Sequence, residues 1–199
     1  MDITLYEYGN NRSARVRWTA LECNIAYETV GGSDLIGSDR LRKVHPLAKL
    51  PAAVIDGRSL FESAAICSYL ADQALDANLI AKVGSWGRAQ HDQWVAFTLT
   101  EMEAWLWNTG VNSYVLPPQE RVTAGFEQIN MMFRRSASVL NDAMAGKDYL
   151  VENRFTVTDI IVGWTVNWGR RTGNLDGLAN LSAYLDRLFA RPQCQLNPE

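Results

Sequence analysis

The sequence has few of the residues that build disulfide frameworks or metal sites. Its 199 residues include three cysteines and two histidines. Cys23, Cys67 and Cys194 are odd in number and widely spaced, which excludes a disulfide framework and a Cys-x-x-Cys motif. Neither His45 nor His91 stands at metal-ligand spacing from the other or from a cysteine. We therefore expect reduced thiols and no bound metal.

The sequence also lacks a long apolar run and an excess of either charge. The longest apolar stretch, around Ile160–Trp168, is far shorter than the ~18 residues that suggest a membrane helix. The N-terminus shows no basic start followed by an apolar run. The 19 Lys and Arg against 22 Asp and Glu give a net charge of −3, which disfavours binding to nucleic acid or to a membrane surface. We expect a soluble, cytoplasmic protein.

The remaining composition is that of a folded protein. Hydrophobic residues make up 47% and charged residues 21% of the chain, enough to bury a core. The length allows one large domain or two small ones. The residue pattern changes after a loose stretch at 74–86, and this change favours two domains.

Residues 1–73 predict a small sheet with helices. Residues 2–8 alternate apolar and polar side chains and end at Gly9, as a strand does before a turn. Asp56-Gly57 suits a tight hairpin, because Gly accepts positive φ without steric cost. Residues 33–49 indicate only a loop or a short helix. The expected elements are a strand at 2–8, a helix at 12–22, strands at 25–30, 52–55 and 59–61, and a helix at 63–73.

From residue 87 onward a helical period replaces the strand patterns. Amphipathic helices are expected at 88–107, 121–144 and 178–190, the second with Val122 in its apolar stripe. The residues TVTD at 156–159 have the form of a capping box, which begins a further helix and gives Asp159 a structural role.

The segment HPLAKLPAAVIDGRSLFESAAICSYLAD at 45–72 carries the most information. It places a proline at the start of a strand, a hairpin, and Glu62-Ser63 at a helix N-terminus. Free backbone N–H groups and a hydroxyl at such a terminus can bind a carboxylate. The residues alone leave open that Ser63 merely caps its helix.

This segment resembles the glutathione-transferase family. There, Asn-Pro-x-Gly-Lys-Val-Pro leads through a hairpin to Glu-Ser-x-Ala-Ile-x-x-Tyr-Leu; here the strings read HPLAKLP (45–51) and ESAAICSYL (62–70). The string RSARVRWTALE (12–22) and the capping box are similar to the family's as well. The resemblance covers nearly the whole chain. It implies an α+β fold, with an N-terminal thioredoxin-like domain at 1–76 followed by an all-α helical-bundle domain at 87–199.

The resemblance also implies a glutathione-binding site. The backbone of Leu50, before Pro51 in an expected cis bond, would pair with the cysteinyl unit of glutathione. Glu62 and Ser63 would hold the γ-glutamyl end. Lys49 would face the glycine carboxylate, with an ordinary surface lysine as the alternative. Each pairing sets a cation or a helix N-terminus against a carboxylate.

The family needs a group near the end of the first strand that stabilises the glutathione thiolate, because a thiol of pKa ~8.5 is little ionised at neutral pH. The family's serine-type position falls on Asn10, its bacterial cysteine-type position on Arg12 and its tyrosine-type position on Tyr6. Asn10 is the first catalytic candidate, since its amide can donate to a thiolate, and Arg12 and Ser13 are the next. Asn11, or no activating group at all, is the alternative; Tyr6 is more simply a packed residue.

The first long helix of the second half forms a wall of the electrophile pocket in the family. Met102 and Trp105 are therefore expected in this pocket, with Tyr8 opposite them. Membership of the core is the alternative, since most aromatic residues on such a helix are core residues.

The resemblance implies a glutathione transferase, in which a bound glutathione thiolate attacks a small hydrophobic electrophile. Glutathione is then a cosubstrate, and no metal is needed. The expected partners are glutathione, the electrophile and a second copy of the chain in a homodimer, with Phe61 either at the dimer interface or in the core. Two alternatives stay open: glutathione-dependent reduction of peroxides or disulfides, and a non-catalytic binding module of the same fold.

Overall fold

A four-stranded sheet organises the first part of the chain. The computed structural model describes residues 1–198; residue 199, the last of the predicted helical domain, lies outside them. The strands are β1 (Ile3–Tyr6), β2 (Glu28–Val30), β3 (Ala52–Ile55) and β4 (Arg58–Phe61). Their order is β2-β1-β3-β4, with β1 parallel to β2 and the other pairs antiparallel. Asp56 and Gly57 join β3 to β4 at positive φ, as the predicted tight turn requires.

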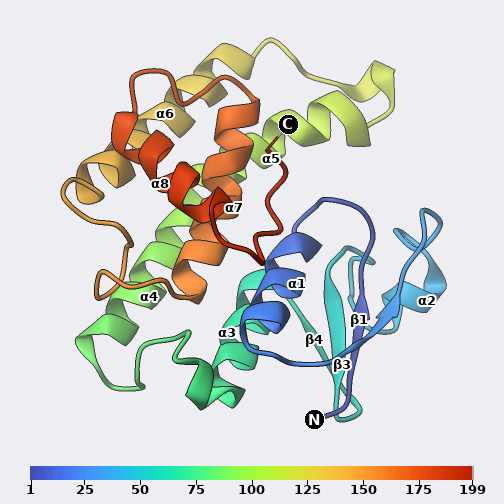
Figure 1. The fold of residues 1–199 in the computed structure, drawn as a ribbon. Coiled ribbons are helices and arrows are strands. Elements are labelled where there is room, and N and C mark those ends of the chain that lie inside the picture. The colour runs from blue at the N-terminus through green and yellow to red at the C-terminus, as the bar shows by residue number, and fades with distance from the viewer. Residues whose placement is uncertain (199) are drawn as a thin grey trace.

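Helices cover both faces of this sheet. The helices α1 (Ser13–Glu22) and α3 (Ser63–Gln73) pack against each other on the face that looks toward the helical part of the molecule (Figure 1). The short helix α2 (Asp39–Arg42) lies beyond the other face, where buried Leu41 packs into a small apolar cluster with Ala52. This helix lies within residues 33–49, for which the sequence predicts a loop or a short helix.

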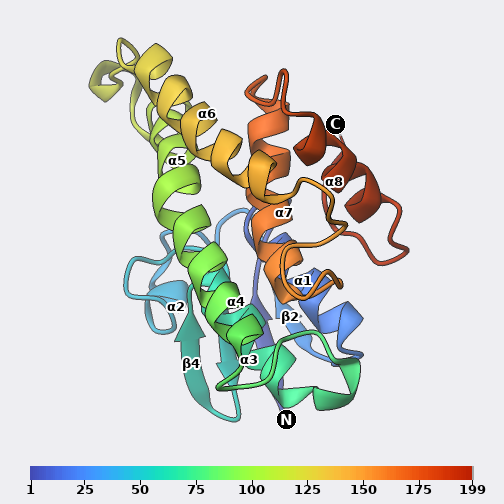
Figure 2. The same ribbon diagram turned by 90° about the vertical axis from the view of Figure 1, so that its left-hand side faces the viewer.

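The second part of the chain is helical throughout. Its longer helices are α4 (Trp86–Phe97), α5 (Ala104–Gly110), α6 (Phe126–Ala143), α7 (Val157–Arg171) and α8 (Ala179–Phe189). Two wide π-helical segments, η2 (Thr98–Glu103) and η3 (Val111–Val115), continue α4 and α5, so that a single rod runs from residue 86 to residue 115 (Figure 2). Short 3₁₀ turns complete the chain at η1 (Leu75–Ala77) and η4 (Pro118–Glu120).

Helix α7 lies at the centre of the molecule and contacts α1, α3, α4 and α8. Two of its glycines permit the close packing: a Cβ on Gly163 would lie 2.3 Å from Leu188 Cδ1, and one on Gly169 would lie 2.2 Å from Phe133 Cζ. A single hydrophobic core, which includes Trp18 and Ile160, extends through both parts of the chain. Within residues 1–198, no helix combines the length and apolarity needed to cross a membrane.

Two predicted helices need correction. The helix expected at 121–144 begins only at Phe126, so Val122 lies before it. Val122 is 67% exposed, and its backbone N–H donates to the side chain of Asn112. The helix expected at 88–107 continues to residue 115 because the π-helical segments extend it. The strands predicted at 2–8 and 25–30 are also shorter than expected.

Candidate functional site

Two adjoining cavities lie where the sheet and the helical part of the molecule meet. The smaller has a volume of about 290 Å³ and the larger of about 610 Å³. Arg12 and Trp107 line both, so the cavities share a wall. Together they have the size of a site for two small molecules.

The smaller cavity brings together all the residues predicted to bind glutathione. These are Lys49, Leu50, Pro51, Glu62 and Ser63. The Leu50–Pro51 bond is cis, as expected. Glu62 has a φ of 70°, a left-handed conformation that is uncommon for a side-chain-bearing residue and here turns the chain sharply into α3. Lys49 is exposed, and its Nζ lies 5.4 Å from the ring centre of Trp107.

The loop between β1 and α1 borders the larger cavity through Asn10 and Asn11. The Asn11 side chain shapes this loop: its Oδ1 accepts from the Ser13 N–H at 2.8 Å, and its Nδ2 donates to the Tyr8 carbonyl at 2.8 Å. Asn side chains commonly support turns in this way. Asn11 is therefore committed to the backbone, whereas Asn10 is exposed at the cavity.

Arg12 lies between the two cavities. Its guanidinium pairs with Glu103 and lies 4.8 Å from the ring centre of Trp107 and 5.7 Å from those of Trp164 and Trp168. Indole faces attract a guanidinium through their quadrupoles. The ion pair and the three rings together fix Arg12 in the shared wall.

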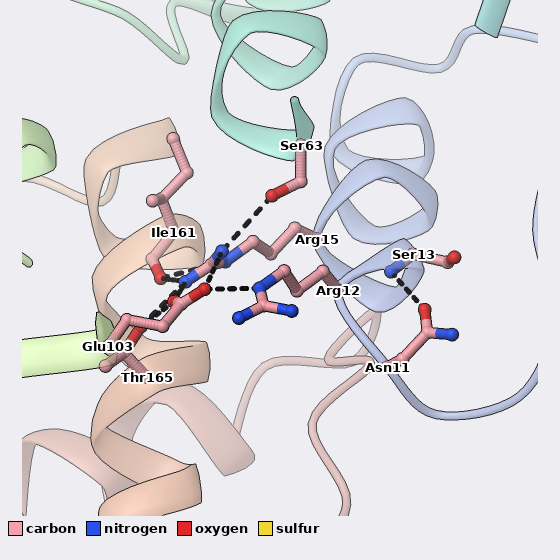
Figure 3. Close-up of polar contacts among 8 residues, drawn as sticks. All are labelled: Asn11, Arg12, Ser13, Arg15, Ser63, Glu103, Ile161 and Thr165. Carbon is pink, nitrogen blue, oxygen red and sulfur yellow. Dashed lines mark hydrogen bonds and ion pairs between the residues drawn. The ribbon is translucent and has the colours of Figure 1, made fainter. Parts of the chain in front are cut away.

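Arg15 lies completely buried and joins elements from both parts of the chain (Figure 3). Its guanidinium donates to Ser63 Oγ at 3.1 Å, to the Ile161 carbonyl at 2.8 Å and to Thr165 Oγ1 at 2.7 Å. Glu103 forms an ion pair with Arg15 and accepts a hydrogen bond from Thr165. A buried charge needs such pairing and hydrogen bonding to be tolerated. The network therefore ties the start of α3 to α7 and η2.

This network also sets the role that Ser63 can play. Because Ser63 Oγ accepts from Arg15, its own proton is available to a ligand in the smaller cavity. A hydroxyl that accepts from a charged donor is itself polarised as a donor. The arrangement suits a ligand carboxylate at Ser63.

Glu103 is ionised over a wide pH range. Burial by itself raises the pKa of this carboxyl, but the charges of Arg15 and Arg12 and the hydrogen bonds from Arg15 and Thr165 outweigh burial and lower the pKa to about 2. The Glu103 carboxylate therefore neutralises part of the charge of the two arginines at neutral pH.

Sequence reasoning missed Arg15, Glu103 and Thr165. One signal was present for Arg15: it precedes Trp18 by three positions and Thr19 by four, which places it on the buried face of α1. No comparable signal marks Glu103, because its partners lie on α1 and α7, at least 62 residues away.

The structure does not place the residues predicted for the electrophile pocket around either cavity. Met102 is completely buried in the core, and Trp105 packs against the core with its indole nitrogen buried. Tyr8 is 46% exposed but lines neither cavity. The larger cavity is lined instead by Trp107 and Leu106 of α5 and by residues of α7.

The residues predicted to stabilise the thiolate also differ in whether they line a cavity. Asn10 and Arg12 line the larger cavity, whereas the Ser13 hydroxyl is buried and lines neither cavity. Tyr6 packs against the small apolar cluster behind the sheet, under Arg40, as expected for a packed residue. Asn10 and Arg12 therefore remain the candidates that line a cavity, because the Asn11 side chain is held by the Ser13 N–H and the Tyr8 carbonyl.

The two buried cysteines and His91 offer no competing reactive centre, whereas His45 lines the smaller cavity, where its Nδ1 accepts from the Leu47 N–H at 3.1 Å. Burial, the main cause, raises the pKa of Cys23 to about 11 and that of Cys67 to about 12, so both are protonated thiols at neutral pH. His91 is buried and bridges Ser68 and Thr158. Among residues 1–198, His, Cys, Asp and Glu form no group suited to a metal ion.

Comparison with known proteins agrees with this architecture. Residues 11–73 match the family model "Glutathione S-transferase, N-terminal domain", and residues 107–192 match "Glutathione S-transferase, C-terminal domain". The chain is 28% identical to Glutathione S-transferase GstA of Escherichia coli O157:H7 over 156 residues, which cover 76% of this chain and 73% of that protein.

Solved structures show the same fold. A glutathione S-transferase from Xylella fastidiosa has a TM-score of 0.85 at 20% identity, covering 97% of this chain and 95% of its own. The theta class glutathione S-transferase of Xanthomonas axonopodis pv. citri, solved with glutathione bound, has a TM-score of 0.81 at 25% identity, with the same coverage of 97% and 95%.

The fold is thus a thioredoxin-like domain followed by an all-helical domain, which confirms the predicted fold class. The chain belongs to the glutathione S-transferase family. It is a glutathione S-transferase, with the particular reaction left open by these relatives.

Proposed function

We propose that the protein joins the thiolate of glutathione to a small hydrophobic electrophile. The observation that carries this proposal is the pair of adjoining cavities with Arg12 and Trp107 in their shared wall. One cavity has a cation and a helix N-terminus, and the other has aromatic walls. Two reactants held side by side in this way react with a large gain in effective concentration.

Glutathione is the proposed occupant of the smaller cavity. The related Xanthomonas structure has glutathione bound. In this chain, Ser63 and Glu62 would hold the γ-glutamyl end, and Lys49 would pair with the glycine carboxylate. The Leu50 backbone would pair with the cysteinyl unit, which sets the sulfur toward Arg12.

The proposed reaction is a nucleophilic substitution or addition. The sulfur electron pair forms a carbon–sulfur bond. In a substitution the leaving group departs with the electron pair of its former bond, and in an addition the electron pair of the broken π bond takes up a proton from water. Asn10 and Arg12 would stabilise the thiolate by hydrogen bonding and positive potential. Lowering the thiol pKa by two units corresponds to ~2.7 kcal/mol of differential interaction.

We also propose that the protein acts as a homodimer in the cytoplasm. Phe61 is 39% exposed, and its ring centre lies 4.8 Å from that of His45. Its exposure supports a place at an interface better than a place in the core.

The first test concerns glutathione binding. Replacing Ser63 with Ala is expected to weaken glutathione binding by about 1–3 kcal/mol, because the variant loses a hydroxyl donor to a ligand carboxylate. Isothermal titration calorimetry measures the change. The matched control is Ser59→Ala, which removes an exposed hydroxyl on β4 away from the cavities. Unchanged affinity in a folded Ser63→Ala variant would remove Ser63 from the site.

The second test concerns the thiolate. Asn10→Ala is expected to raise the pKa of the bound glutathione thiol, because it removes a donor at the cavity, whereas Tyr6→Phe is expected to leave it unchanged. Ultraviolet titration of the thiolate in the glutathione complex measures both. A pKa raised by Tyr6→Phe alone contradicts the assignment and points to a tyrosine-type enzyme.

Turnover separates the proposed reaction from its alternatives. Conjugation is measured with glutathione and 1-chloro-2,4-dinitrobenzene by the absorbance of the thioether. Glutathione binding without turnover of any electrophile or peroxide would identify a binding module, and turnover of peroxides or disulfides alone would identify a reductase.

A further inference from the structure

The larger cavity combines aromatic walls with positive charge. Its aromatic lining comes from Trp107 and Tyr114 on one side and from Trp164 and Trp168 of α7 on the other. The rings of Trp164 and Trp168 meet edge to face, with centres 5.4 Å apart. Large flat rings in this number favour a planar aromatic ligand.

The cavity also contains three arginines and has no acidic residue in its described lining. Arg12 shares the Glu103 carboxylate with Arg15. Among residues 1–198, Arg170 is held by neutral groups only: the Asn167 Oδ1 at 3.1 Å, the Pro198 carbonyl and the Phe189 ring, whose centre lies 5.5 Å from the guanidinium carbon. Arg171 is exposed, and no ion pair forms there among residues 1–198. Two positive charges at the cavity are thus without a counter-charge in the described chain.

The end of α7 explains why two arginines can stand side by side, but it does not neutralise their charges. Both lie in the last turn of α7, where cations interact favourably with the helix dipole. That interaction permits two adjacent arginines, but the partial charge of a helix end offsets only about half of one unit charge. The lining that residues 1–198 contribute to the cavity is therefore positive, in a chain with a net charge of −3.

We infer that the electrophile is a planar aromatic molecule with one anionic group, such as a carboxylate. Its ring lies against the tryptophans, and its anionic group lies at Arg171 and Arg170, at the end of the cavity formed by the last turn of α7. Arg–carboxylate pairing is strong and directional. This inference rests on the proposed function, because it names the substrate class for the same reaction.

The test compares two probes that differ only in charge: 4-chloro-3-nitrobenzoate and its neutral amide, 4-chloro-3-nitrobenzamide. In both, the glutathione thiolate attacks the ring carbon that bears chlorine, a carbon–sulfur bond forms, and chloride leaves with the electron pair. For each probe, kcat/KM is divided by the rate constant of the uncatalysed reaction. We expect the ratio of this quantity for the benzoate to that for the benzamide to exceed one. Arg171→Gln is expected to lower this ratio about tenfold, as loss of a charge-assisted bond does.

Two further variants define the controls. Arg171→Lys keeps the charge and is expected to retain most of the preference for the benzoate. Arg135→Gln removes an exposed arginine of α6 away from the cavity and is expected to keep the wild-type ratio. A ratio that Arg171→Gln leaves unchanged, or a wild-type preference for the benzamide, overturns the inference.

A binding measurement separates this inference from the proposed function. If neither these probes nor 1-chloro-2,4-dinitrobenzene is turned over, the proposed conjugation fails, and quenching of tryptophan fluorescence then decides the inference. Tighter binding of the benzoate than of the benzamide, lost in Arg171→Gln, supports the anionic site. Equal affinities for the two probes overturn it.

Discussion

Replacing Glu103 with Ala is expected to lower the free energy of unfolding by about 3–5 kcal/mol, because it leaves the buried guanidinium of Arg15 without its counter-charge. Arg12 loses the same partner. Urea denaturation at neutral pH measures the loss. Glu101→Ala is the matched control: Glu101 lies in the same segment, η2, but is exposed, and its loss is expected to change stability by less than about 0.5 kcal/mol.

The acid side of the stability profile gives an independent check on Glu103. Its pKa falls from the usual 4.5 in the unfolded chain to about 2 in the folded protein. A lowered folded-state pKa means that the stabilisation is fully present above pH 4.5 and disappears as the pH falls through about 2. The shift corresponds to about 3 kcal/mol. Glu103→Gln is therefore expected to unfold with a weaker pH dependence than wild type between these values.

A second variant tests the same ion pair if Glu103→Ala does not fold. The double replacement Arg15→Met with Glu103→Leu removes both charges and is expected to recover much of the lost stability, because apolar residues often replace a buried ion pair without net cost. A Glu103→Ala protein within about 1 kcal/mol of wild type contradicts the proposed role of the ion pair.

The fold was largely readable because its signals are local. The tight turn at Asp56-Gly57, the helix beginning at Ser63 and the capping box at 156–159 each depend on a few neighbouring residues. The segment that we propose binds glutathione was predictable for the same reason, since Lys49 to Ser63 are brought together by one hairpin. Features that depend on a few neighbouring residues can be predicted from the sequence, because the local preferences of those residues agree with the fold.

The lining of the larger cavity could not be predicted in this way because it depends on the rotation of a long helix. The family resemblance assigns the helix as a whole to the pocket and does not specify which of its faces lines the cavity. Met102 and Leu106, four residues apart, share the buried face. Met102 therefore points into the core, and Trp107 faces the cavities. Neither π-helical segment is visible in the apolar pattern of the sequence.

The buried network could not be read because its contacts are long-range. Arg15 resembles its neighbours Arg12 and Arg17, yet only Arg15 is completely buried. Its burial depends on acceptors that lie as much as 150 residues away, such as Thr165. Helical spacing places Arg15 on the same face as Trp18, but only the packing of α1 against α7 reveals its partners.

Asp159→Ala is expected to lower the free energy of unfolding by about 2–4 kcal/mol, because several buried donors lose their only carboxylate acceptor. Asp159 Oδ2 accepts from the Thr156 N–H at 2.8 Å, and Oδ1 accepts from the Leu150 N–H at 3.1 Å and the Tyr184 hydroxyl at 2.9 Å. Asp186→Ala, which removes an exposed carboxylate on α8, is the matched control and is expected to change little.

The pH dependence of the same site distinguishes the buried carboxyl from an ordinary helix cap. Burial, the largest influence, raises the pKa of Asp159 from 3.8 to about 6, although four hydrogen bonds oppose the rise. The native state therefore holds this proton more tightly than the unfolded chain, so its stabilisation is present below pH 3.8 and is lost as the pH rises toward 6. Urea denaturation from pH 4 to pH 7 is expected to show this downward slope in wild type and to lose it in Asp159→Asn, which cannot titrate. Equal slopes in the two proteins, or an Asp159→Ala variant no less stable than Asp186→Ala, would show that the carboxyl is solvated rather than enclosed by Thr156, Leu150 and Tyr184.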